Sequence, residues 1–182
     1  LWVTEQGGTV WRIDATTGKR KQLLLINDVW RKRTAGLLGI TLHPDFTTQP
    51  FVFVNYTLMR DSVIFSRLER YRFQNDTLVE PTTVLEIGGN TAHNGSRLTI
   101  SPDKKIIWAT GDAYTITNAQ SDTCLNGKIL RINLDGTIPA DNPDPKSYVW
   151  AKGFRNMQGL VHSDKGLLYT AEHGDAIEDE IN

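Results

Sequence analysis

The chain has 182 residues, of which 39% are apolar and 23% are charged, and its formal net charge is −1. This is the size and composition of one globular domain, and the near-neutral charge argues against a nucleic-acid partner, which would require a basic excess. No apolar stretch is long enough to span a bilayer, and a single cysteine, Cys124, excludes an internal disulfide.

Short strands separated by turns are predicted along the whole chain. Apolar or alternating runs that are typical of strands occupy, in chain order, residues 1–4, 9–14, 52–55, 66–73, 83–87, 98–100, 107–110, 128–133 and 168–171. Within residues 20–34, a single turn of helix is expected near residues 27–30. No amphipathic helix of three turns is predicted.

Four of these runs resemble one another, because each is apolar with an aromatic residue near its centre. They lie about 50 to 60 residues apart, at residues 1–4, 52–55, 107–110 and 168–171. Turn signals that combine Asp with Pro or Gly precede the last three runs, at residues 43–45, 101–105 and 162–166. This spacing is typical of the blades of a β-propeller with long loops.

An all-β chain with such a repeat can be a sandwich, a β-solenoid or a propeller. The repeat length and its content of about four strands favour the propeller, and 182 residues make about three blades. Three blades would leave open strand edges and half of an apolar tunnel. We therefore expect residues 1–182 to be part of a longer single domain that is truncated at both ends. A self-contained sandwich is the alternative.

The first segment with candidate chemistry is the polar, glycine-containing loop at residues 90–98, which contains His93. A histidine in this loop is expected at the inner edge of a blade, where the mouth of the ring lies. An imidazole there could act as a catalytic base. A histidine that only stabilises the turn or lies on the surface is the other interpretation.

The second segment, residues 153–160, carries Arg155 and Asn156 between glycines. A guanidinium beside an amide suits the recognition of carboxylate or carbonyl oxygens. An arginine that only binds loop carbonyls would fit the same pattern, so both interpretations stay open.

The third segment is acidic. Residues 172–175 and 178–182 are dense in Asp and Glu and include a glycine-bearing loop. Carboxylate and carbonyl oxygens are the ligands that calcium prefers. A solvated acidic run is the alternative.

These segments occur in a distinctive order with several others. The blocks that carry this order are residues 2–5, 36–46, 93–98, 111–112, 125–132, 153–160 and 172–182. The series resembles the soluble quinoprotein glucose/sorbosone dehydrogenases, also called aldose sugar dehydrogenases, over essentially the whole chain. The resemblance implies an all-β, six-bladed β-propeller, of which this chain would be the N-terminal half.

The resemblance also implies an enzyme that oxidises the anomeric hydroxyl of aldoses with pyrroloquinoline quinone (PQQ). His93 matches the general base, which takes a proton while hydride passes to the quinone, and it also lies against the cofactor. Arg155 and Asn156 match residues that contact the oxygens of the quinone.

Calcium (Ca²⁺) is the second cofactor that the resemblance implies. Gly174 and Asp175 match positions whose backbone carbonyls hold the ion that bridges protein and quinone and polarises the quinone as a Lewis acid. Asp179 and Glu180 match part of a second, structural calcium site.

The implied partners are a sugar substrate and a separate electron acceptor, in the periplasm or outside the cell, and a homodimer is compatible with the resemblance. Two positions depart from the pattern of the family. Thr34 and Ala35 precede Gly36, where an acidic residue or Gln is common, and Ala92 precedes His93, where a polar residue is common. Both departures concern the substrate pocket more than the cofactor site.

Two other functions are alternatives for a propeller of this kind. One is a propeller that has lost redox chemistry and binds proteins, and the other is a calcium-dependent propeller hydrolase of the lactonase type. His93 together with Arg155 and Asn156 favours the dehydrogenase over a binding scaffold. The predicted inner strands do not obviously supply the ring of axial carboxylates that the hydrolase would need.

Overall fold

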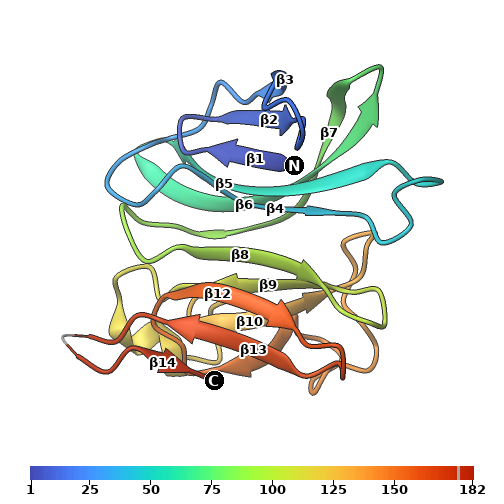
Figure 1. Ribbon diagram of the computed structural model, residues 1–182. Coiled ribbons are helices and arrows are strands. Elements are labelled where there is room, and N and C mark those ends of the chain that lie inside the picture. The colour runs from blue at the N-terminus through green and yellow to red at the C-terminus, as the bar shows by residue number, and fades with distance from the viewer. Residues whose placement is uncertain (176) are drawn as a thin grey trace.

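The computed structural model describes residues 1–175 and 177–182. Figure 1 shows an all-β structure in which four antiparallel sheets follow one another from the N-terminus to the C-terminus. In the part of the chain that the structure describes, the one helical element is the 3₁₀ helix η1 (Ile116–Gln120). No described helix has the length and apolar character that crossing a membrane would require.

Each sheet is built from strands that are consecutive in the chain. The first contains β1 (Trp2–Glu5), β2 (Thr9–Ile13) and β3 (Arg20–Leu25). The second contains β4 (Leu37–Leu42), β5 (Phe51–Arg60), β6 (Val63–Gln74) and β7 (Thr77–Gly88). The third contains β8 (Gly95–Ile100), β9 (Ile106–Thr110), β10 (Lys128–Ile132) and β11 (Val149–Lys152). The fourth contains β12 (Met157–His162), β13 (Leu168–Glu172) and β14 (Glu180–Ile181).

The described residues thus form two complete four-stranded sheets and two three-stranded ones. The prediction of an all-β propeller fragment is confirmed, and the predicted three blades are distributed over four sheets, of which the first and last are incomplete. The first strands of successive sheets lie side by side, because β1 contacts β4, β4 contacts β8, and β8 contacts β12. This is the arrangement of blades around a common axis.

The core lies between the sheets. Val52 and Val54 of β5 pack toward the first sheet, whereas Phe53, between them, packs against Trp108 of the third sheet. Neighbouring residues of a strand point to opposite faces, and both faces of this strand are covered, so the whole run is apolar. A third cluster, which includes Met157, joins the third sheet to the fourth.

Three predictions about individual elements were wrong or incomplete. The run at residues 1–4 corresponds to a first strand, β1, whereas the runs at 52–55, 107–110 and 168–171 lie in second strands, β5, β9 and β13. The two kinds of strand differ in burial, because the residues of β1 alternate between half-buried and exposed, whereas residues 52–55 of β5 are fully buried. The helical turn expected near residues 27–30 is absent, since Val29 instead forms a β-bridge with Leu58. The predictions also missed η1 and several strands, including β3 and β4.

The inner strands β4 and β8 lie so close together that position 39 has no space for a side chain, and Gly39 occupies it. A Cβ atom at this position would lie 2.1 Å from the backbone oxygen of Ser96. We expect Gly39→Ala to lower the free energy of unfolding by about 1–3 kcal/mol, because the strands must separate to admit the methyl group. Denaturant titration of the full-length protein measures this loss.

Gly7→Ala is the matched control, because a Cβ at Gly7 would meet only the tip of the Arg31 side chain, at 3.7 Å. Equal unfolding midpoints for the two variants would contradict the close packing of β4 on β8.

Candidate active site

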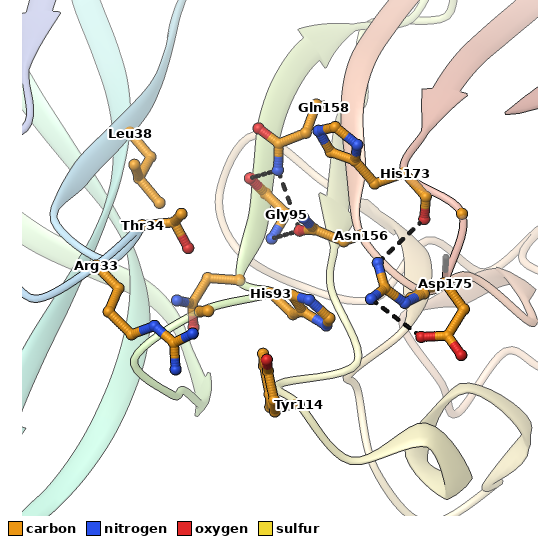
Figure 2. A pocket seen from close by; sticks show the side chains of 14 residues that line it. Arg33, Thr34, Leu38, His93, Gly95, Tyr114, Asn156, Gln158, His173 and Asp175 are labelled. Carbon is orange, nitrogen blue, oxygen red and sulfur yellow. Dashed lines mark hydrogen bonds and ion pairs between the residues drawn. The ribbon is translucent and has the colours of Figure 1, made fainter. Parts of the chain in front are cut away.

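A cavity of about 440 Å³ lies at one end of the inner strands. Its walls come from connections between strands of all four sheets. The β3–β4, β7–β8, β9–β10, β11–β12 and β13–β14 connections all contribute. Five of the residues singled out from the sequence line it, namely His93, Arg155, Asn156, Gly174 and Asp175. Figure 2 shows Arg33 and Thr34 on one side, His173 and Asp175 on the other, and His93 with Tyr114 between them.

His93 is paired with a buried carboxylate. Its Nδ1 atom lies 3.0 Å from Oδ1 of Asp112, and the side chains are 14% and 4% exposed. The ring of Tyr114 lies against the imidazole, with the ring centres 4.4 Å apart. Nε2 of His93 has no hydrogen-bond partner among the described residues, so this nitrogen is available to a bound molecule.

Asp112 is itself held from several directions. Its backbone N–H donates to the carbonyl of Arg155 (2.8 Å), and its own carbonyl accepts from Nδ2 of Asn118 (2.9 Å). Oδ1 of Asp112 also accepts from the backbone N–H of Tyr114 (2.8 Å). These bonds orient the carboxylate toward His93.

Gly111 allows the Asp112 and His93 loops to meet, because a Cβ at Gly111 would lie 2.0 Å from the backbone oxygen of His93. Asp112 lies in one of the blocks that carry the family resemblance, at residues 111–112, but no role was predicted for it. The available signal was its position, because Asp112 lies two residues after the end of strand β9, at the same end of the sheet as the His93 loop.

A buried cation supports the loop that carries Asn118. Lys128 is fully buried, and its ammonium group donates to the carbonyls of Asn118 (2.6 Å), Asn126 (2.7 Å) and Ala119 (3.2 Å). Burial lowers the pKa of Lys128. The three carbonyls nevertheless accept hydrogen bonds from its charged form. These bonds hold η1 against the third sheet and thereby fix Asn118, whose amide donates to the backbone carbonyl of Asp112.

Arg155 and Asn156 form another part of the wall. The Arg155 guanidinium donates to the carbonyl of His173 (3.3 Å) and to Oδ1 of Asp175 (3.4 Å). Oδ1 of Asn156 accepts from the backbone N–H of Gly95 (3.2 Å) and from Nε2 of Gln158 (3.0 Å). Nδ2 of Asn156 has no partner among the described residues, which leaves an amide donor at the cavity.

The backbone around these two residues is fixed by one carboxylate. Glu172 accepts hydrogen bonds from the backbone N–H groups of both Arg155 and Asn156. A side-chain substitution at either position would leave these backbone bonds in place.

The residues predicted to bind calcium, two at the quinone and two at a separate structural site, line adjoining parts of the surface. Gly174 and Asp175 line the cavity, and both also line a neighbouring groove with Glu180. Asp179 and Glu180 line a further groove. Oδ1 of Asp179 accepts from the backbone N–H of Gly174 (3.0 Å). The described residues contain no group of three or more His, Cys, Asp or Glu side chains placed to hold a metal ion. An ion at Gly174 and Asp175 would therefore depend on backbone carbonyls and on ligands from elsewhere.

The departures from the family pattern lie at the cavity, as expected of pocket residues. Thr34 and Ala92 line it, and Ala35, the neighbour of Thr34, is fully buried. Sequence reasoning missed several further lining residues, among them Arg33, Leu38, Asn94, Tyr114 and His173. No periodicity or motif distinguishes Arg33 and Tyr114 from ordinary loop residues.

The whole chain is similar to known sugar dehydrogenases. The sequence profile of the Glucose / Sorbosone dehydrogenase family matches residues 1–182. The chain is 32% identical to quinoprotein glucose dehydrogenase B of Acinetobacter calcoaceticus, covering all of this chain and 45% of that protein. It is 29% identical to an aldose sugar dehydrogenase of Escherichia coli, covering all of this chain and 52% of that protein.

A solved structure supports the same relationship. The PQQ-bound aldose sugar dehydrogenase from Streptomyces coelicolor superposes with a TM-score of 0.93 at 34% identity, over all of this chain and 55% of that one. The present chain spans about half the length of the relatives that it matches.

Proposed function

Because the chain belongs to the glucose/sorbosone dehydrogenase family, we propose that the full-length protein oxidises aldose sugars at the anomeric carbon. The reaction removes a proton from the anomeric hydroxyl and a hydride from C1, which converts the cyclic aldose to a lactone. The observation that carries the proposal is the His93–Asp112 pair at the cavity, with Nε2 of His93 available for the hydroxyl proton.

Asp112 positions His93 for this role. A carboxylate that accepts from the Nδ1–H of His93 selects the tautomer in which Nε2 is the basic nitrogen. The same carboxylate stabilises the imidazolium that forms when Nε2 takes the proton. Since the side chain of Asp112 is only 4% exposed, water screens this interaction little.

The residues of the cavity fit PQQ. A volume of about 440 Å³ lies in the range of cofactor pockets, and the amide donor of Asn156 has no protein partner in the described chain. Arg155 adds a cationic donor that would bind the oxygens of an anionic quinone. When bound, PQQ would supply the acceptor for the hydride. The family resemblance and the PQQ-bound relative support this cofactor.

Calcium is part of the proposal. Backbone carbonyls of Gly174 and Asp175 would hold an ion at the cavity, where it would act as a Lewis acid on the cofactor. Asp179 and Glu180 would contribute to a neighbouring structural ion through carboxylate oxygens. The full-length protein would act on its sugar in the periplasm or outside the cell, pass electrons to a separate acceptor, and could form a homodimer.

The test is reconstitution of the full-length protein with PQQ and Ca²⁺, followed by dye-linked oxidation of aldoses. We expect turnover only when both cofactors are present, and loss of turnover when a chelator removes calcium. A protein that binds no quinone with or without calcium would overturn the proposal and favour a non-catalytic propeller.

A further inference from the structure

Arg33 places an unpaired positive charge at the mouth of the cavity. It lies in the β3–β4 connection, and its guanidinium carbon lies 5.5 Å from the centre of the Tyr114 ring. Figure 2 shows the side chain reaching from its own side of the cavity toward Tyr114. Among the described residues, the guanidinium has no hydrogen-bond acceptor and no carboxylate partner, so its charge is available to a ligand.

The backbone holds Arg33 in this position. Nε2 of Gln6 donates to the carbonyls of Arg33 (2.8 Å) and Ala35 (2.9 Å). Arg33 has a φ of 55°, in the left-handed region that non-glycine residues seldom adopt. A residue kept in this conformation at a cavity wall is held there by its surroundings. The backbone position of Arg33 in the wall is therefore fixed.

The carboxylates near the cavity are already engaged. Asp112 pairs with His93, and Asp175 faces Arg155. Neither is paired with Arg33, so the wall around it presents an excess of positive charge. A cation of this kind selects ligands with a negative group, because the anion replaces the water that the guanidinium otherwise binds.

Arg33 and His93 share one aromatic neighbour at the cavity. The ring centres of His93 and Tyr114 are 4.4 Å apart, and the centre of the Tyr114 ring is 5.5 Å from the guanidinium carbon of Arg33, so this carbon lies at most about 9.9 Å from the His93 ring centre. A sugar whose anomeric hydroxyl reaches His93 therefore has its opposite end within reach of Arg33. The anomeric hydroxyl would face His93 and the opposite end of the sugar would face Arg33.

We propose that Arg33 is a specificity-determining residue that binds a carboxylate on the substrate, so that the preferred substrates are aldoses with an acidic group remote from the anomeric carbon, as in hexuronic acids. This inference rests on the proposed sugar oxidation and concerns the same cavity. The reaction at C1 is unchanged, and the carboxylate takes no part in it.

The test compares kcat/KM for glucuronic acid with that for glucose, and galacturonic acid with galactose, in the reconstituted full-length protein. We expect the wild type to prefer the acidic sugar of each pair, and Arg33→Gln to lower that preference about 10- to 100-fold, mainly through KM. The kcat/KM for each neutral sugar should fall less than that for its acidic counterpart. Lys32→Gln removes a neighbouring exposed charge that does not line the cavity, so it controls for general electrostatic attraction.

Three outcomes would overturn the inference. The wild type could prefer the neutral sugars, Lys32→Gln could lower the preference as much as Arg33→Gln does, or Arg33→Gln could weaken quinone binding in a direct titration and leave the sugar preference unchanged. In each case turnover of neutral aldoses would leave the proposed function intact. A protein that binds no quinone and oxidises no aldose of either kind would overturn both proposals.

Discussion

Replacing His93 with alanine in the reconstituted full-length protein is expected to lower kcat for aldose oxidation by about 10²–10⁴-fold, the usual contribution of a general base. The loss should appear in kcat rather than in KM, because the imidazole acts on the proton during the reaction. Quinone binding should stay close to that of the wild type, since Arg155 and Asn156 remain in place. Dye-linked turnover and a quinone titration measure the two quantities separately.

Asp112→Asn tests the positioning of the same base. The amide cannot stabilise the imidazolium and can reverse the tautomer of His93, so we expect a lower kcat with normal quinone affinity. Dye-linked turnover and a quinone titration measure the two quantities, and turnover of Asp112→Asn equal to that of the wild type would contradict the positioning role of Asp112. If the His93→Ala variant kept the kcat of the wild type, His93 would not be the general base.

Arg155→Ala is expected to act on the cofactor as well as on the rate. Loss of a charged donor should weaken quinone binding about 10- to 100-fold, and loss of stabilisation for negative charge in the transition state should lower kcat by up to about 10²–10³-fold. The local backbone conformation should stay the same in this variant, because the backbone N–H groups of residues 155 and 156 still donate to the carboxylate of Glu172.

The control for this variant is Lys152→Ala. Lys152 is an exposed cation three positions away that pairs with Asp122 outside the cavity. Its removal should leave quinone affinity unchanged. If the affinity of Arg155→Ala also equals that of the wild type, the guanidinium does not contact the cofactor.

Much of the fold could be predicted from local pattern. Val52, Phe53 and Val54 form a continuous apolar run because β5 is covered on both faces, and such a run is visible in the sequence alone. The strand position within a blade could not be predicted in this way. Residues 1–4 and 52–55 both combine aliphatic residues with one aromatic residue, yet the first run lies in a first strand that is half exposed and the second in a second strand that is fully buried. Local composition does not distinguish these two environments.

By itself the sequence determined the strand-rich class, the blade repeat and the chemical inventory, including an imidazole, a guanidinium and several carboxylates in polar loops. Only the tertiary structure decided which of them meet. Asp112 is 19 positions from His93, and Arg33 and Tyr114 come from the connections of different sheets. Asp179, which shares an acidic run with Asp175, lies outside the cavity. The physical reason is that side-chain chemistry is local, whereas proximity depends on how the sheets pack around their axis, and that packing is set by contacts between residues far apart in the chain.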